Sequence, residues 1–396
     1  MKRFFNSTTI SVGLAIFSML FGAGNLVYPV LVGISSGNQH LIGILGFILT
    51  AVCLPVIGLI SMVFFKGNYD KFFGRLGETP GKICVFICML IIGPLLAIPR
   101  IVTLSHVMTA PFLPAPLNTI NPWSSFMFAI LFLGLTFLGT FRKNKIVNVL
   151  GHFISPALLI SLLIIIIKGI LTADTTFENT ATPLVTFKEN VKLGYATLDL
   201  LGTIFFASIV LSAIARSTKQ DHLSHKQQAL IGLKSGVIGA VLLALVYTGI
   251  NYLGAYHGLG IIYANIGELF REVSFKILGS HGGILISLAV FMACYSTAIS
   301  LAAVIATFIR REIFKKKIGF ISALIIGLLA CLPLSTAGLG TVLNLTAGPI
   351  TYIGYPALIA LTLLNLAYKL WDFKPVKIPV AITFLTMLLI YAYQYL

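Results

Sequence analysis

Apolar residues form long runs that recur along the whole chain of 396 residues and are separated by short polar or charged segments. Each run holds roughly 20 residues, enough for a helix rising 1.5 Å per residue to cross a hydrocarbon layer about 30 Å thick. The pattern predicts an all-α polytopic membrane protein with about eleven transmembrane helices. Their expected ranges are 8–35, 40–65, 83–110, 122–141, 147–171, 193–215, 228–256, 281–309, 318–334, 341–367 and 379–395.

Composition supports this class. Hydrophobic residues make up 58% of the chain and charged residues only 10%, whereas soluble domains carry about 25% charged residues. A soluble enzyme is therefore excluded. The net charge of +16 would suggest nucleic acid as the partner of a soluble chain. Here the basic residues lie in short clusters between apolar runs, so we expect a lipid bilayer and no nucleic acid.

Lysine and arginine concentrate in alternate loops. These loops hold most of the 27 basic residues: Lys2, Arg3, Lys66, Lys71, Arg75, Lys82, Arg142, Lys143, Lys145, Arg216, Lys219, Lys226, Arg310, Arg311, Lys315, Lys316, Lys317, Lys369, Lys374 and Lys377. The opposite loops are poor in cations and contain Asp174, Glu178, Glu189, Glu268 and Glu272. The positive-inside rule then predicts a cytoplasmic N-terminus and, after eleven spans, a C-terminus outside.

The longest segment expected outside is about 257–280. Its apolar residues Tyr263, Ile266, Leu269, Phe270 and Val273 have the spacing of a short amphipathic helix. Such a helix is either a lid over the outer mouth or an ordinary surface helix.

Two spans are internally interrupted. The first contains Phe21-Gly22-Ala23-Gly24-Asn25 with Pro29 close behind, and glycine and proline both weaken a helix. The sixth contains Leu198-Asp199-Leu200-Leu201-Gly202-Thr203, which places an acid and a glycine at comparable depth. The third span carries Pro94 and Pro99 but is too short to cross twice, so we expect one kinked helix.

The positions of the two interruptions predict an inverted repeat. Because five is odd, the sixth span enters the membrane from the side opposite to the first. The expected units are repeat one at about 8–171, repeat two at about 193–367 and an additional helix at about 379–395, together one transporter domain. Interrupted helices expose N–H and C=O groups at the midplane, which is tolerable where they line a cavity or bind a ligand. Close helix packing is the alternative explanation for Gly22 and Gly24.

No set of residues indicates an enzyme. The cysteines all lie within apolar runs and indicate neither a disulfide framework nor a metal site: Cys53, Cys84, Cys88, Cys294 and Cys331. The histidines are scattered over loops and span ends: His40, His106, His152, His222, His225, His257 and His281. A phosphate-binding loop and an intramembrane pair of acids are both missing from the sequence.

Four segments resemble the bacterial branched-chain amino acid:cation symporters. They are Phe21-Gly22-Ala23-Gly24-Asn25 with Tyr28-Pro29, Gly93-Pro94 to Pro99-Arg100, Thr197 to Gly202, and Thr297-Ala298. The resemblance implies a leucine-transporter-like fold, with a 5+5 inverted repeat and discontinuous helices 1 and 6. It also implies import of leucine, isoleucine and valine across the bacterial cytoplasmic (inner) membrane, driven by sodium. That family usually has twelve spans, so we expect the missing final helix to affect packing or oligomer contacts more than the site.

A zwitterionic substrate needs replacements for the water around its two charges. Half-helix N-termini supply N–H groups for a carboxylate, while free carbonyls suit an ammonium group or sodium. We expect the N–H groups of Ala23, Gly24 and Asn25 to hold the carboxylate, with Gly22 and Gly202 at the breaks. The ammonium group is expected at carbonyls near Phe21 and between Leu198 and Leu200.

Asp199 is the one acid predicted inside a span, where ionised carboxylates usually face a cavity or a partner. It either recognises the ammonium group or sodium directly, or pairs with Arg100. Arg100 is expected to be a gate residue or counter-charge, unless its side chain snorkels to the outer interface.

The resemblance implies a sodium site between the first and eighth spans. Its expected ligands are the hydroxyls of Thr297 and Ser300, which share a helix face, with carbonyls near Ser18 and Phe21. Asn25 could serve a second sodium site or the substrate carboxylate. The alternative for the hydroxyls is bonding back to their own helix. No cofactor is expected apart from sodium as the coupling ion.

Three other functions remain open at this stage. A proton-coupled transporter of neutral amino acids would act through Asp199, a channel would use the polar breaks as a filter, and an amino acid sensor would bind without transport. Ile98, Phe205 and Phe206 are candidates for the apolar substrate pocket. The sequence ranks neither the three substrates nor the oligomeric states.

Overall fold

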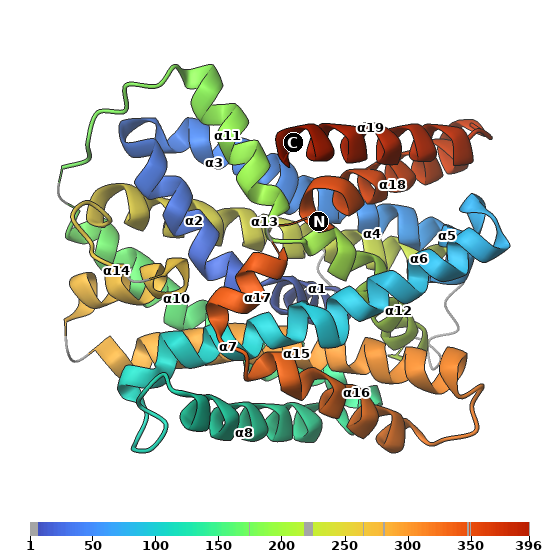
Figure 1. Ribbon diagram of the computed structural model, residues 1–396, viewed down its shortest axis with the longest axis horizontal. Coiled ribbons are helices and arrows are strands. Elements are labelled where there is room, and N and C mark those ends of the chain that lie inside the picture. The colour runs from blue at the N-terminus through green and yellow to red at the C-terminus, as the bar shows by residue number, and fades with distance from the viewer. Residues whose placement is uncertain are drawn as a thin grey trace.

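The structure is a computed structural model that describes residues 7–173, 175–217, 225–263, 265–279, 282–346, 348 and 350–395. Every regular element in these ranges is helical, as predicted (Figure 1). Eight helical stretches of the described residues are long and apolar enough to cross a membrane, and three shorter apolar helices accompany them. Residues used above that lie outside the described ranges are Lys2, Arg3, Asp174, Lys219, His222 and His281, together with the side chain of His225.

The first span is divided into α1 (Ser7–Leu20) and α2 (Ala23–Ser36), which confirms the predicted interruption. Between them Gly22 is extended, with φ −98° and ψ −170°. The Asn25 side chain stabilises the new helix start, because its Oδ1 accepts a hydrogen bond of 3.1 Å from the Gly22 N–H. The N–H of Asn25 donates to the Gly22 carbonyl at 3.1 Å, whereas the N–H groups of Ala23 and Gly24, which precede the first complete turn of α2, lack an acceptor four residues back within the helix.

The sixth span is divided into α11 (Pro183–Tyr195) and α12 (Asp199–Ser217). The predicted start at residue 193 is wrong, because Lys188, Glu189 and Lys192 interrupt the apolar pattern of α11 without ending the helix. The break comes directly before Asp199, at Leu198, whose φ is +60°. Gly202 was predicted to take part in the break but lies inside the first turns of α12.

The third span is one kinked path, as predicted. It runs through α6 (Glu78–Leu90) and a π-helical segment (Ile91–Leu95) to α7 (Ala97–Thr109). Inside the segment Gly93 has non-helical angles, φ −102° and ψ −114°. Pro94 follows and supplies no backbone N–H, so the helical hydrogen bonds cannot continue here. The kink ends directly before the turn that carries Arg100.

The remaining helices agree with the predicted order of spans. Their bounds are α3 (His40–Ile48), α4 (Leu54–Phe64), α5 (Tyr69–Phe73), α8 (Pro122–Thr140), α9 (Ile146–Val149), α10 (Ser155–Leu171), α13 (His225–His257), α14 (Leu269–Leu278), α15 (Gly283–Phe308), α16 (Phe320–Ser335), α17 (Leu339–Thr346), α18 (Tyr355–Trp371) and α19 (Lys377–Tyr395).

The helices pack in two groups. In one group α13 packs along α1 and α2, while α12 packs on α4 and α11 on α3. In the other group α15 packs against α7, α8 and α16, which lie together in the lower part of Figure 1. The groups meet where α1 and α12 contact α15. The two helix breaks therefore lie at the boundary between the groups.

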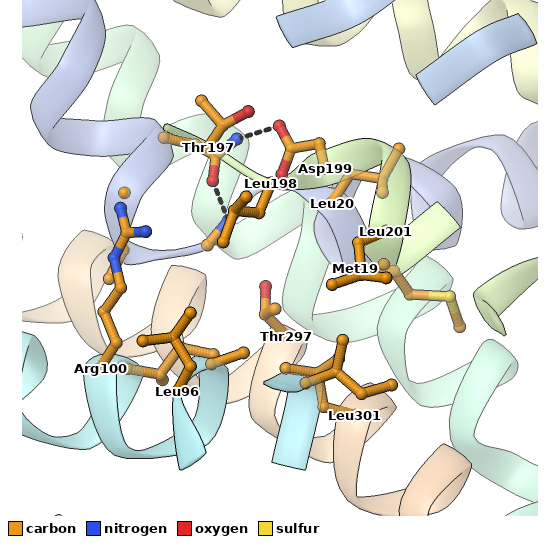
Figure 2. A pocket seen from close by; sticks show the side chains of 18 of the residues that line it. Met19, Leu20, Leu96, Arg100, Thr197, Leu198, Asp199, Leu201, Thr297 and Leu301 are labelled. Atoms are coloured by element: carbon orange, nitrogen blue, oxygen red, sulfur yellow. Dashed lines mark hydrogen bonds between the residues drawn. The ribbon is translucent and has the colours of Figure 1, made fainter. Parts of the chain in front are cut away.

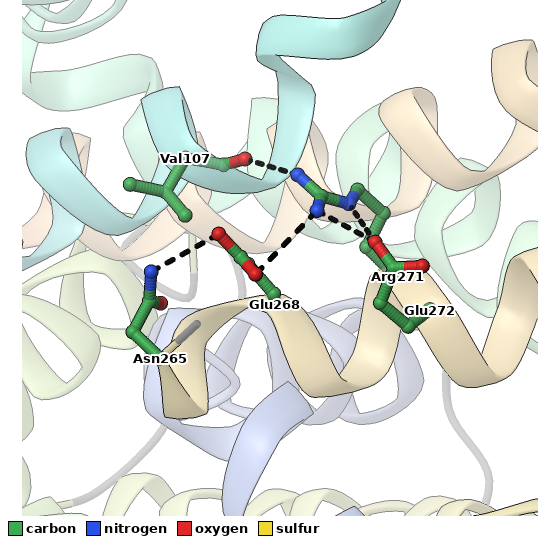
Figure 3. A network of polar contacts seen from close by, with 5 residues as sticks. All are labelled: Val107, Asn265, Glu268, Arg271 and Glu272. Carbon is green, nitrogen blue, oxygen red and sulfur yellow. Dashed lines mark hydrogen bonds and ion pairs between the residues drawn. The ribbon is translucent and has the colours of Figure 1, made fainter. Parts of the chain in front are cut away.

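The helix predicted within 257–280 is confirmed as α14. Leu269, Phe270 and Val273 are buried beneath it. Arg271 ties it to the end of α7, because its Nη1 donates a hydrogen bond of 2.8 Å to the Val107 carbonyl (Figure 3). Glu272 accepts from the same guanidinium at 2.6 Å. α14 is therefore held by both apolar and charged contacts.

Candidate substrate-binding site

A cavity lies between the two helix breaks, bounded further by α7 and α15 (Figure 2). The predicted site residues that line it are Gly22, Ala23, Gly24, Asn25, Arg100, Leu198, Asp199, Gly202 and Thr297. The predicted residues that do not line it are Ser18, Phe21, Leu200 and Ser300. Most of the residues predicted from two distant segments are thus brought to one place.

The size of this central cavity is about 70 Å³. At about 10–15 Å³ per water molecule, it has room for roughly five to seven waters. That many waters, at about 30 Å³ each in the liquid, take up about as much space as a small aliphatic amino acid. Much of its wall is apolar and includes Ile91, Leu201, Phe206 and Leu301.

Asn25 and Asp199 are in direct contact across the two breaks. Nδ2 of Asn25 donates a hydrogen bond of 2.7 Å to Oδ2 of Asp199. Tyr247 of α13 completes the cluster, because it accepts a hydrogen bond from Asn25 and donates one of 3.4 Å to Asp199. All three side chains are buried. The carboxylate therefore has fixed polar partners at the edge of the cavity.

Arg100 and Asp199 do not form an ion pair in the described part of the chain. Nη1 of Arg100 instead donates a hydrogen bond of 3.0 Å to the Ala196 carbonyl, and its guanidinium lies 5.3 Å from the centre of the Tyr28 ring. Arg100 is only 7% exposed. Its side chain is therefore held within the protein rather than extended to a membrane interface.

Helix ends stabilise both of these buried charges. Arg100 lies at the C-terminal end of α11, where the unpaired carbonyls carry partial negative charge. Asp199 is the first residue of α12, where the N–H groups of the first turn carry partial positive charge. The two helix ends at the break in the sixth span therefore offset the charges of Arg100 and Asp199, which do not pair with each other.

Hydroxyl groups of α15 meet the end of α1. Oγ of Ser296 donates a hydrogen bond of 2.7 Å to the Ser18 carbonyl, and Oγ1 of Thr297 lies 3.5 Å from the same oxygen. Ser300 instead donates to the Ser296 carbonyl of its own helix at 2.9 Å. Ser18 and Thr297 are thus brought together as predicted. The back-bonded alternative occurs at all three hydroxyls, because Thr297 and Ser296 also donate to the Ala293 carbonyl of their own helix, at 3.3 Å and 3.0 Å. In the described residues no group of three or more His, Cys, Asp or Glu could hold a metal ion.

Phe21 and Leu200 lie behind the cavity wall. The Phe21 ring stacks on Phe17 and Tyr247, with centroids 5.2 Å and 5.9 Å away. The N–H of Leu200 donates a hydrogen bond of 3.2 Å to the hydroxyl of Tyr355 in α18. This bond uses one of the free N–H groups at the start of α12.

Two polar residues escaped the sequence analysis, Tyr247 and Tyr355, and Ser296, a neighbour of the predicted Thr297, was not chosen as a ligand. Tyr247 lies within the long apolar helix α13, and Tyr355 is the first residue of α18, directly after Gly354. Of the three candidates for the apolar pocket, only Phe206 lines the cavity. Phe205 packs on Tyr69 instead, with ring centroids 5.4 Å apart.

A sequence profile of the branched-chain amino acid transport protein family matches residues 5–394. The chain belongs to this family. The transporter is 30% identical to the branched-chain amino acid permease BrnQ of Bacillus subtilis, over 94% of this chain and 84% of the permease. It is also 30% identical to a putative branched-chain amino acid carrier protein of Staphylococcus saprophyticus, over 97% of this chain and 88% of that one. The family is one of transporters, in agreement with the prediction that the chain is not an enzyme.

Solved structures give the fold of the transporter. Mhp1, a nucleobase-cation symporter solved in a closed conformation, matches with a TM-score of 0.61 at 14% identity, over 98% of this chain and 93% of Mhp1. A sodium-coupled sialic acid symporter matches with a TM-score of 0.60 at 12% identity, over 96% and 90% of the two chains. The leucine-transporter-like fold that the resemblance implied is thereby confirmed.

Proposed function

We propose that the transporter imports leucine, isoleucine and valine together with sodium across the bacterial cytoplasmic membrane, with its N-terminus inside. The observation that carries this proposal is the central cavity. It joins the N-terminus of α2, the broken sixth span and an apolar wall within one enclosure of suitable size. The relatives named for branched-chain amino acids support the substrate class.

The substrate is held chiefly by backbone groups. The N–H groups of Ala23, Gly24 and Asn25 lie at the positive end of α2 and bind the carboxylate. The ammonium group lies near the carbonyl of Leu198, which lines the cavity, and not at the predicted Phe21 carbonyl, which lies behind its wall. Asp199 provides negative charge on that side, while the apolar wall surrounds the branched side chain. A pocket of this kind accepts all three substrates, because one methylene is worth only about 1–3 kcal/mol.

Sodium binds where α1 ends beside α15. The carbonyls of Ser18 and Phe21 and the hydroxyls of Thr297 and Ser296 form its oxygen cage, since hydroxyl and carbonyl oxygens are the hard ligands that sodium requires. The hydrogen bond of Ser296 to Ser18 supports this placement. Ser300 donates to the Ser296 carbonyl and so supports this site indirectly, whereas Asn25 supports the break itself through its bond with the Gly22 N–H. Sodium then stabilises the end of α1 that shapes the substrate site, so both ligands favour one conformation.

Arg100 acts as a gate. A second cavity of about 700 Å³ is lined by Tyr28 and Ala196, the two residues that Arg100 contacts. Arg100 itself lines the central cavity. The three residues therefore lie between the two cavities. During alternating access the group of helices around α13 moves against the group around α15, and release of Arg100 from Ala196 opens the passage.

Purified transporter in proteoliposomes tests the proposal. Uptake of labelled leucine is measured with an inward sodium gradient, an inward proton gradient or neither, and in competition with unlabelled amino acids. We expect accumulation only with sodium and competition by isoleucine and valine. Accumulation driven by protons alone would replace sodium with protons, and flux that neither saturates nor accumulates would indicate a channel.

A further inference from the structure

Four basic side chains converge on a cavity where α8 ends and α16 begins. This basic cavity has a volume of about 430 Å³ and is lined by Arg142, Lys143, Lys145 and Arg310, with Phe141 and Phe320 beside them. The transport mechanism proposed above uses none of these residues. The positive-inside rule explains cations in a loop, but it does not require them to surround a hollow between helices.

The charges in the basic cavity have no acidic partner among the described residues. The two acids nearby, Asp70 and Glu312, both pair with Arg311, at 2.9 Å and 3.1 Å. Lys143 is held in place by a neutral group, because its Nζ donates a hydrogen bond of 2.7 Å to Oγ1 of Thr307 in α15. The cavity therefore concentrates positive charge that a bound anion can neutralise.

The walls of the basic cavity are aromatic, and apolar surface adjoins them. Nζ of Lys143 lies 5.5 Å from the Phe320 ring centre, and the Arg142 guanidinium lies 5.2 Å from that of Phe141. α8 and α16 pack side by side (Figure 1). Near the cavity they expose apolar side chains such as Leu138, which is 60% exposed, and Ile321, which is 51% exposed. Charge and apolar surface thus adjoin at one end of the helix bundle.

We propose that the basic cavity binds the headgroup of an anionic phospholipid, with the acyl chains along α8 and α16. The lipid phosphate accepts hydrogen bonds from the arginine and lysine side chains, which are stronger than neutral ones because both partners are charged. Basic pockets between helices at the cytoplasmic side suit such headgroups. The bound lipid joins the loop after α8 to the end of α15 and so stabilises the group of helices around α15.

The test compares two triple variants of the full chain. R142Q/K145Q/R310Q removes three charges from the cavity and leaves the half-buried Lys143 in place. K315Q/K316Q/K317Q removes three charges from the neighbouring loop, outside the cavity lining. Binding of phosphatidylglycerol and of phosphatidylcholine with the same acyl chains is measured by native mass spectrometry in detergent. Thermal unfolding is followed with each lipid and with inorganic phosphate.

We expect phosphatidylglycerol, and neither phosphatidylcholine nor inorganic phosphate, to bind the unmodified transporter and raise its unfolding temperature. The loop variant should behave in the same way, whereas the cavity variant should bind phosphatidylglycerol at least about tenfold more weakly. Equal weakening in both variants, or none in the cavity variant, would overturn the proposal. The same stabilisation by inorganic phosphate would also overturn it, because the ligand would then be a free anion. These measurements do not depend on transport.

Discussion

Asn25 donates a hydrogen bond of 2.7 Å to Asp199, although the two residues are 174 positions apart in the chain. Asn25 lies in the first turn of α2 and Asp199 begins α12, so the contact links the two discontinuous spans. The same Asn25 side chain accepts the Gly22 N–H. The Asn25 amide group thus links the backbone at the first break to the carboxylate at the second.

Replacement of Asp199 by asparagine should greatly reduce transport. The asparagine amide oxygen can still accept from Asn25 and Tyr247, but the substitution removes the negative charge proposed to face the substrate ammonium group. Hydrogen bonds to charged groups contribute about 1.5–3 kcal/mol, so sodium-driven leucine uptake should fall at least about tenfold. Initial rates in proteoliposomes, normalised to reconstituted protein, measure this effect.

The control for that experiment is Asp70→Asn. Asp70 lies in the short helix α5, pairs with Arg311 and does not line the central cavity. The Asp70→Asn variant should retain most of the sodium-driven leucine uptake. If Asp199→Asn transports leucine with unchanged affinity and unchanged sodium dependence, Asp199 has no direct part in binding.

The sodium site predicts different effects for three hydroxyl groups of α15. Ser296→Ala and Thr297→Ala remove oxygens that lie 2.7 Å and 3.5 Å from the Ser18 carbonyl. Each substitution should raise the sodium concentration for half-maximal uptake. The increase is about tenfold if about 1.4 kcal/mol of sodium-binding free energy is lost. Ser300→Ala is the matched control, because the Ser300 hydroxyl donates to the Ser296 carbonyl and not to the Ser18 carbonyl, which Ser296 and Thr297 both reach. A larger effect at Ser300 than at Thr297 would refute this placement.

Gly24→Ala should impair the proposed gate. A Cβ atom at Gly24 would lie 2.5 Å from Nη2 of Arg100, so the guanidinium would have to leave its place beside Ala196. We expect faster labelling of a cysteine introduced in the central cavity, together with reduced uptake. Gly134→Ala is the control, because nothing lies within 4 Å of a Cβ at that helical position. Unchanged labelling in Gly24→Ala would mean that Arg100 does not close the passage.

Leu201→Ala should broaden substrate selection. Leu201, with Ile91 and Leu198, lines both the central cavity and a neighbouring apolar cavity of about 180 Å³. Removing its side chain would join the two cavities and admit longer side chains. Competition by methionine and phenylalanine should improve relative to valine, by roughly tenfold from a few added apolar contacts. Leu358→Ala enlarges only the neighbouring cavity and should preserve the selectivity; an identical shift in both variants would contradict this role.

The local chemistry of the breaks explains why much of the site could be predicted. Gly22, Gly24 and Asn25 weaken a helix wherever they occur together, and an acid such as Asp199 is conspicuous in an apolar span. The start of the sixth span was misplaced because the charges of α11 resemble those of a loop. Its residues nevertheless remain helical and pack against α3.

The remaining site residues depend on tertiary packing. Tyr247 lies in the middle of α13, where its neighbours give no sign that its hydroxyl meets Asp199. Three hydroxyl residues lie within five positions of α15, namely Ser296, Thr297 and Ser300, and the sequence does not rank them. Only the approach of the Ser18 carbonyl distinguishes them. The basic cavity likewise requires the loop after α8 to lie beside Arg310. Contacts between distant segments leave no local sequence signal.

The most direct measurement is a cryo-electron microscopy reconstruction of the transporter with leucine and sodium. The account predicts leucine density in the central cavity, with its carboxylate at the N–H groups of Ala23 to Asn25 and its ammonium group towards Leu198 and Asp199. Leucine density elsewhere, with the central cavity empty or filled by side chains from a continuous first span, would contradict it.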